Sequence, residues 1–245
     1  IPRIAIPRRR HASVAAAALT ALALPTGIAV GLLVGIINGL GVAYLRVPSM
    51  IFTLGMNAVM RGLMVMHTGG FAPQTHSTPL MEFLAVGHVF GVPMALLVWL
   101  GIAALIYVML TRTPLGRYIY ATGNREAATY LSGVNTQLVL VAAFAISGVL
   151  AATAGVLLAG YSTKAYQGMG DAYLLPAIAA VVIGGTNILG GRGKLSGTLV
   201  GTILIVLLTS VLSVMQMPEA GRQVIYGLVI IVMLLVYGRG DRVQS

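Results

Sequence analysis

The feature that most constrains the fold of this chain is a succession of long apolar runs, separated by short segments that hold Gly, Pro and most of the charges. A helix needs about 20 apolar residues to cross the hydrocarbon core of a bilayer. The runs therefore predict an all-α fold, a polytopic transmembrane helix bundle with about seven spans in this chain. The predicted spans are residues 13–44, 48–68, 92–110, 136–160, 173–188, 195–215 and 222–238.

Two of these runs do not fit a single straight crossing. The run 13–44 is too long and contains Pro25 and Gly27, so we expect a tilted, kinked or partly re-entrant segment. The run 173–188 is short, which indicates the same kind of irregularity.

The composition agrees with a membrane protein and excludes several other classes. Charged residues make up 8% of the chain, against about 25% in soluble domains. The net charge of +10 comes from Lys and Arg in short loops, so nucleic-acid binding is not expected. The absence of cysteine excludes disulfides and thiolate sites, and the four His residues lack ligand spacing, so no metal site is expected. We see no Ser/His, paired Asp or HExxH constellation, and expect no catalytic residue and no enzymatic activity.

Charge in the loops predicts the orientation. The segments 111–135, "GGRGK" and "GRGDR" carry basic residues and are predicted to be cytoplasmic. Alternation of the spans then places 69–91, 161–172 and 216–221 outside, where Lys164 is the single basic residue.

The same counting divides the chain into a basic N-terminal segment, residues 1–12, a transmembrane domain, residues 13–238, and a cytoplasmic tail, residues 239–245. It places the basic segment outside, against the charge bias. Either the run 13–44 is a hairpin that returns to its own side, or further spans precede it. We expect the second.

A polar segment, "GRYIYATGNREAATYLSGVN", interrupts the apolar pattern at residues 116–135. Asn124 is a good N-cap, Glu126 puts an acid in the first turn, and Gly133 is suited to a left-handed stop. About two helical turns are therefore predicted between them. A helix this short is marginal alone in water.

The predicted short helix has a small apolar face, formed by Ala127, Ala128 and Leu131, that needs something to pack against. One interpretation is a helix on the lipid surface, anchored by Tyr118, Tyr120 and Tyr130. The other is a docking helix for a soluble partner. The pattern leaves both open.

Four stretches in order resemble one family. They are "VPSMIFTLGMNAVMRGL", "LGRYIYATGNREAATYLSGVN", "ISGVLAATAGVLLAG" and "DAYLLPAIAAVVIGGTNILGGRGKLSGTLVGTIL". Together these are similar to the permease subunits of bacterial ABC importers for simple sugars, the ribose/xylose/autoinducer-2 permease family. The resemblance covers about residues 31–238.

The resemblance implies a multi-pass permease of the bacterial inner membrane, surrounded by lipid, that moves a ribose-like monosaccharide by alternating access. Its implied partners are an ABC ATPase subunit, a periplasmic sugar-binding protein and a second permease copy or homologue. ATP and Mg²⁺ would be bound by the ATPase, so no cofactor is expected in this chain. The loop 111–135 would be the ATPase-coupling loop, through Gly116, Arg117, Gly123, Asn124, Glu126, Ala127, Ala128 and Gly133.

Polar residues within the predicted spans are candidates for a substrate path. Asn38 and Asn57 lie mid-span and could meet sugar hydroxyls, or could hold helices together. Arg61, inside the second predicted span, could contact substrate or extend to the outer boundary. An ion-coupled secondary transporter of a small solute is the alternative function, although it usually needs acids deep in the bundle.

Small residues spaced by four also recur, at Gly31 and Gly35 and again at Gly197 and Gly201. In membrane helices this spacing lets two backbones approach closely. It predicts a helix crossing at each pair.

Overall fold

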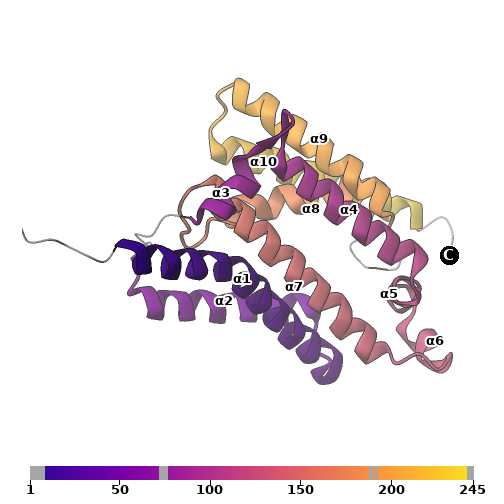
Figure 1. Ribbon diagram of the computed structural model, residues 1–245. Coiled ribbons are helices and arrows are strands. Elements are labelled where there is room, and N and C mark those ends of the chain that lie inside the picture. Colours follow the sequence, from indigo (N-terminus) through magenta and orange to yellow (C-terminus); the bar gives the residue numbers. More distant parts are fainter. Residues whose placement is uncertain (1–8, 72–76, 188–189, 191–192, 242–245) are drawn as a thin grey trace, which may run out of the picture. The chain divides into compact units, whose positions relative to one another are not determined.

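The computed structural model describes residues 9–71, 77–187, 190 and 193–241, with side chains described from residue 22 to residue 235 within these ranges. The described part is helical apart from one small hairpin (Figure 1), which confirms the all-α prediction. The elements are α1 Arg9–Leu45, α2 Ser49–Thr68, α3 Pro79–Val86, β1 His88–Val89, β2 Val92–Pro93, α4 Met94–Arg112, α5 Pro114–Asn124, α6 Glu126–Leu131, α7 Thr136–Tyr161, η1 Asp171–Tyr173, α8 Leu174–Ile183, α9 Leu195–Val214 and α10 Glu219–Asp241.

Five helices of the described part are long and apolar enough to cross a membrane, and their side chains are mostly uncovered by protein. They correspond to five of the seven predicted spans, and a lipid environment accounts for their exposed apolar surface. The seventh predicted range lies within α10. The five candidate spans are Leu22–Leu45, Ser49–Thr68, Met94–Arg112, Thr136–Tyr161 and Leu195–Val214.

The run 173–188 does not form a full crossing, as its short length led us to expect. The helix found there, α8, has 10 residues, and at 1.5 Å per residue it reaches about 15 Å, half the hydrocarbon core. Gly185 ends it in the left-handed region, with φ of 79°. Its N–H bonds the Val182 carbonyl while the Thr186 N–H bonds Val181, which is a Schellman motif.

The first run is one continuous helix of 37 residues, with Pro25 inside it. The re-entrant interpretation of residues 13–44 is therefore wrong, and so is the hairpin that would return to its own side. Proline lacks the N–H that would bond the carbonyl four residues earlier, here that of Ala21. Next to Pro25, Thr26 Oγ1 donates to the neighbouring carbonyl oxygens of Leu22 and Ala23, at 2.8 and 3.0 Å.

The chain divides into two compact units, of which the first comprises residues 1–102 and 137–167. Within it α1 crosses α7 at glycines. A Cβ on Gly35 would lie 3.0 Å from the Ala145 Cα, and one on Gly148 would meet the carbonyl oxygen of Gly31. The crossing predicted from Gly31 and Gly35 is confirmed.

The loops at one end of this first unit are joined by hydrogen bonds. Ser77 N donates to Thr163 O at 2.9 Å, and Gln167 Nε2 donates to Thr68 Oγ1 at 3.3 Å. The segments 69–91 and 161–172, which the sequence predicts on one side of the membrane, are thus in contact.

The second unit comprises residues 103–136 and 168–245, and α8 lies in it between α9 and α10. Its core consists of Ala179, Ala180, Ile205 and Tyr226. The Tyr226 hydroxyl lies 2.7 Å from Thr209 Oγ1, which satisfies a buried polar group between α9 and α10. The second glycine pair also marks a crossing, because a Cβ on Gly197 or Gly201 would meet backbone carbonyls of α8 and the residue that follows it.

Candidate functional site

The polar loop between α4 and α7 begins with a helix that the sequence analysis missed. Thr113 is the N-cap of α5, its Oγ1 accepts a hydrogen bond from Gly116 N at 3.3 Å, and Pro114 stands at the first helical position. A Thr followed by Pro is a recognised start signal. The sequence analysis looked for a helix only between Asn124 and Gly133, and so did not find α5.

Gly116 is required where α5 turns back on α4. It is buried, and a Cβ there would lie 2.5 Å from Leu110 Cα and 2.6 Å from its carbonyl carbon. Contacts this short with backbone cannot be relieved by a side-chain rotation. Glycine therefore sets the sharp angle between the membrane helix and the loop.

The short helix α6 is present, but its predicted N-cap is wrong. Asn124 is the last residue of α5, and Arg125 is the extended residue (φ −151°, ψ 99°) between the two helices. Arg125 N donates to Ala121 O at 3.1 Å, so this residue also closes α5. The expectation failed because the backbone before Asn124 is already helical, and an N-cap must be non-helical.

The end of α6 agrees with the sequence. Gly133 has φ of 84°, as predicted for a left-handed stop. Its N–H donates to Tyr130 O at 2.9 Å, and Val134 N donates to Thr129 O at 3.4 Å. These two bonds form a Schellman motif, which satisfies carbonyls at the helix end.

Glu126 lies in the first turn of α6, as predicted, and is bonded to a membrane helix. Thr136 Oγ1, at the first residue of α7, donates to Glu126 Oε1 at 3.3 Å. Thr136 is 4% exposed. The sequence analysis did not single out Thr136. The two residues are ten positions apart across an irregular loop, and no spacing rule predicts a contact between them.

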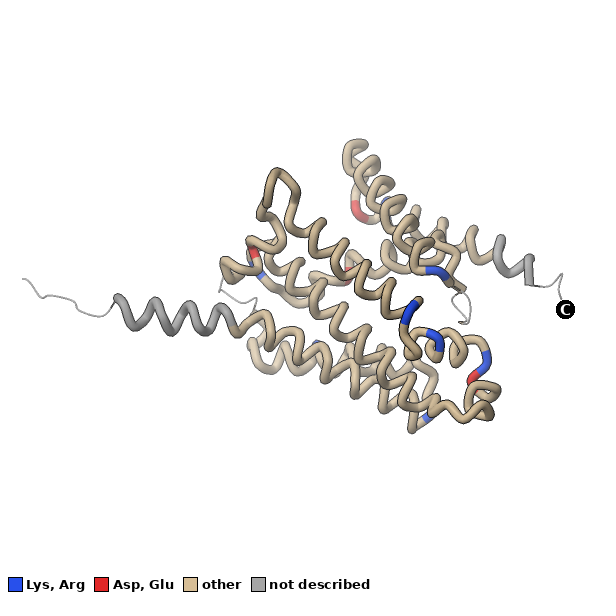
Figure 2. Tube along the Cα trace, turned by 45° about the vertical axis from the view of Figure 1, so that its right-hand side comes forward, with Lys and Arg blue, Asp and Glu red and all other residues tan. Residues whose placement is uncertain are grey.

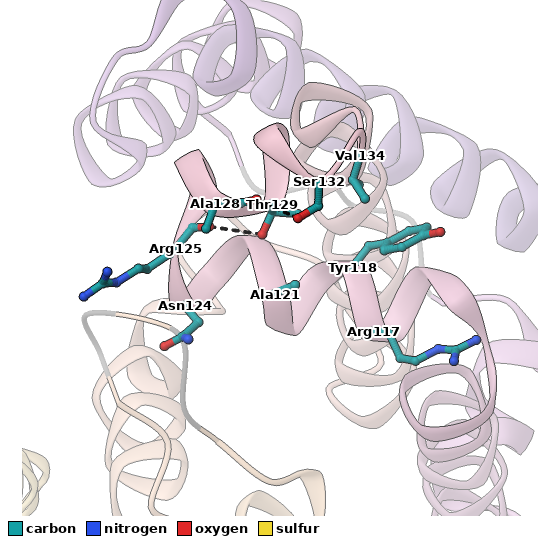
Figure 3. Close-up of a pocket in the computed structure, with 9 residues that line it drawn as sticks. All are labelled: Arg117, Tyr118, Ala121, Asn124, Arg125, Ala128, Thr129, Ser132 and Val134. Atoms are coloured by element: carbon teal, nitrogen blue, oxygen red, sulfur yellow. Dashed lines mark hydrogen bonds between the residues drawn. The ribbon is translucent and has the colours of Figure 1, made fainter.

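A hollow of about 470 Å³ lies between α5 and α6. Thr129, buried on its floor, donates from Oγ1 to Arg125 O at 3.1 Å. Figure 3 shows the guanidinium groups of Arg117 and Arg125 pointing away from the hollow in opposite directions. The lining residues are Arg117, Tyr118, Ala121, Asn124, Arg125, Ala128, Thr129, Ser132 and Val134.

The predicted apolar face of α6 is not covered by the described residues. Ala127 and Ala128 are exposed, Tyr130 is 68% exposed, and Leu131 is 85% exposed. The helix is thus fixed on one side by Thr129 and the bonds at its two ends, while its other side is free to meet something outside the chain.

Gly190, the first residue of the basic segment that ends at Lys194, lies beside this loop. Gly190 has φ of 95°, and a Cβ on it would lie 3.1 Å from Gly123 O. Figure 2 shows the Lys and Arg positions mostly at helix ends. Gly190, which begins the basic segment, is therefore a neighbour of the segment 111–135 within the second unit, and the sequence predicts both to be cytoplasmic.

Of the three residues proposed for a substrate path, two lie together on α2 and the third lies on α1. Arg61 Nε donates to Asn57 Oδ1 at 3.4 Å, and both side chains are exposed on α2. Asn38 lies on α1, where its Oδ1 is buried without a hydrogen-bond partner among the described residues. Around the axis of α1, at 100° per residue, Asn38 lies between two positions. One is Gly35, which contacts α7, and the other is Gly41, which contacts Phe52 of α2.

The long apolar helices and the structured loop between α4 and α7 define a multi-pass helical membrane protein. The family described as "Branched-chain amino acid transport system / permease component" matches residues 11–234, and the chain belongs to this family.

Individual relatives agree with the resemblance found in the sequence. The ribose import permease protein of Haemophilus influenzae is 36% identical over 217 residues, 87% of this chain and 67% of the relative. The ribose import permease protein of Escherichia coli is 36% identical over 220 residues, 88% of this chain and 68% of the relative. The autoinducer 2 import system permease protein of Escherichia coli is 33% identical, over 89% of this chain and 64% of the relative. The chain spans about two thirds of the length of these relatives. No solved structure matches the chain significantly.

Proposed function

We propose that this chain is the transmembrane permease subunit of an ABC importer in the bacterial inner membrane, and that it moves a ribose-like monosaccharide. The family description names branched-chain amino acids, whereas relatives that cover most of this chain are named for ribose. The relatives are the support for a sugar, since one family holds permeases with different cargoes.

One observation supports the coupling mechanism above all others: α6 is anchored on one side and open on the other. An isolated helix of 6 residues does not persist in water. The Schellman motif at Gly133, the buried Thr129 and the bond from Thr136 to Glu126 hold it in place. Its Ala127 and Leu131 side is left for a cytoplasmic ATPase to contact.

In the proposed cycle the ATPase binds ATP and Mg²⁺, closes, and displaces α6. The movement passes into α7 through the Glu126 and Thr136 pair, and the rigid helices rock to open the path alternately to each side. A periplasmic sugar-binding protein delivers the monosaccharide, and a second permease copy or homologue completes the path. This chain acts as a transport subunit and not as an enzyme, since its relatives are transport components.

No observation favours the ion-coupled alternative. Acidic side chains that bind coupling ions lie deep in membrane bundles. The acids whose side chains are described here lie outside the five candidate spans, at Glu82, Glu126, Asp171 and Glu219.

Cross-linking tests the proposal. The chain has no cysteine, so Ala127→Cys and Leu131→Cys each introduce a unique thiol. Both are expected to cross-link to the ATPase in intact membranes. Val214→Cys is the control, because Val214 is 84% exposed at the far end of α9 and is predicted to face outside. Failure of both α6 positions to reach the ATPase, or equal capture by Val214→Cys, contradicts the coupling role.

A further inference from the structure

A second apolar surface, partly exposed, lies far from the coupling loop in sequence, on the segment between α2 and α4. We name it the α3 surface: Leu80, Phe83 and Val86 of α3, with Phe90 of the hairpin that follows. The coupling mechanism does not use it.

One side of α3 is fixed against α7 within the first unit. Thr78 Oγ1 accepts from Met81 N at 3.3 Å and starts the helix. A Cβ on Gly160, in the last turn of α7, would meet the Met81 carbonyl and lie 3.1 Å from Ala85 Cβ. Met81 and Ala85 are four residues apart, so they share one face of the helix.

The opposite side of α3 is only partly covered by the described chain. At 100° per residue, Phe83 stands about 180° from the middle of the packed face, with Leu80 and Val86 on either side of it. Their exposed fractions are 45%, 46% and 47% for Leu80, Phe83 and Val86. This short helix is therefore apolar on both faces, one against protein and one against the surroundings.

The hairpin after α3 presents a further aromatic ring. Strands β1 and β2 pair His88 with Pro93 and Val89 with Val92, so Phe90 and Gly91 form the two-residue turn. Both have positive φ, 53° and 81°. Such turns favour Asn-Gly, and a bulky residue in this region is strained. Phe90 is nevertheless fully exposed. No contact within the described chain therefore offsets the backbone strain or the cost of exposing the aromatic ring to water.

We propose that the α3 surface lies in the boundary between headgroups and acyl chains of the bilayer, on the side opposite the coupling loop. Both flanking helices, α2 and α4, are candidate spans, so the segment starts and ends at the membrane surface. Met66 and Phe71 at the end of α2 are also largely exposed. Glu82 is the single charged residue from 77 to 93.

This composition suits lipid better than a protein that docks and leaves. A transient partner would return Leu80, Phe83, Val86 and Phe90 to water between encounters, at a cost in proportion to their apolar area. Lipid covers them at all times, and burial in the interface holds short apolar segments in this way. The inference depends on membrane insertion and not on the cargo or the ATPase.

Spin labels on single cysteines test the proposal in vesicles of purified chain and phosphatidylcholine. Phe83→Cys and Phe90→Cys are the probes. The control is Gln216→Cys, because Gln216 has the same φ of 53° as Phe90 and is exposed in the turn between α9 and α10. We expect labels at both Phe positions to collide with oxygen several-fold more than with a water-soluble nickel chelate, relative to the label at Gln216.

Two results would overturn the proposal. Nickel accessibility at both Phe positions equal to that at Gln216 would place the α3 surface in water. Low accessibility to both reagents would show that protein covers the α3 surface. If the protection is present in the purified chain, the cover is a second copy. If it appears only when the binding protein is added, the cover is the binding protein. Should Phe90→Cys not fold, Leu80→Cys replaces it, since Leu80 lies on the same exposed face and outside the strained turn.

Discussion

Thr136 Oγ1 donates a hydrogen bond to Glu126 Oε1 across 3.3 Å, and so ties the first turn of α6 to the first residue of α7. Thr136 is buried, whereas Glu126 is exposed. The bond links the short helix α6 to a candidate span. In the proposed coupling mechanism, a displacement of α6 would pass to α7 through this bond.

The substitution Thr136→Val should weaken this link while keeping the shape of the side chain. Loss of one hydrogen bond removes about 1 kcal/mol, or about fivefold in an equilibrium. We expect monosaccharide uptake per ATP hydrolysed to fall about fivefold in vesicles with the partner ATPase and binding protein, and Thr136→Ser to restore it.

Thr153→Val is the matched control for this experiment. Thr153 lies in the same helix and its Oγ1 donates only to Val149 O in the preceding turn, at 2.8 Å. Its uptake ratio should equal that of the unmodified chain. Equal ratios for Thr136→Val and Thr153→Val would show that the pair does not transmit force.

Gly133→Ala should destabilise the loop. The left-handed conformation of Gly133, with φ of 84°, costs about 1 kcal/mol for a residue with a Cβ. Gly155→Ala is the comparison, because Gly155 lies inside α7 with open space around it, where Ala is favoured over Gly by about 0.5–1 kcal/mol. Thermal unfolding in detergent should give a lower Tm for the first and an equal or higher Tm for the second. A Tm for Gly133→Ala at or above that of Gly155→Ala would contradict the Schellman assignment.

Local sequence signals predicted some parts of this structure well. The four-residue spacing of Gly31 and Gly35 predicted a helix crossing, because only small residues let backbones approach, and the crossing with α7 is present. Gly133 predicted the end of α6. Hydrophobic run length identified the five candidate spans but overestimated α8, since Gly184 and Gly185 end that helix within the apolar run.

Other parts were misread or have no signal in the sequence. The assignment of Asn124 as an N-cap failed because α5 occupies the residues before it, and Thr113 with Pro114 was the signal to use. The bond between Thr136 and Glu126 depends on how the chain folds back after Gly133. Pair contacts across an irregular loop have no fixed period, so no spacing rule predicts them.

Gly31→Val should disrupt the packing of α1 on α7. A Cβ at Gly31 would lie 2.6 Å from the carbonyl oxygen of Gly148, and backbone must move to make room. Overpacking of this kind costs about 1–3 kcal/mol. Gly62→Val is the control, because Gly62 on α2 has nothing within 4 Å of an added Cβ. We expect a marked fall in Tm and in monodisperse yield for Gly31→Val alone; similar behaviour of the two variants would show that the crossing does not contribute to stability.

Asn38→Leu separates the two interpretations of this residue. The buried Oδ1 of Asn38 has no hydrogen-bond partner in the described chain. A buried unsatisfied acceptor costs about 1–3 kcal/mol, so its replacement by an apolar group of similar size should leave Tm unchanged or raise it. If the amide instead bonds sugar hydroxyls during transport, uptake should fall at least tenfold while the protein remains folded.

Asn57→Leu is the control, because Asn57 is exposed and already accepts from Arg61 Nε, and we expect a smaller loss of uptake. A fall in Tm for Asn38→Leu would identify the amide as a link between helices, and normal uptake with normal Tm would remove Asn38 from the substrate path.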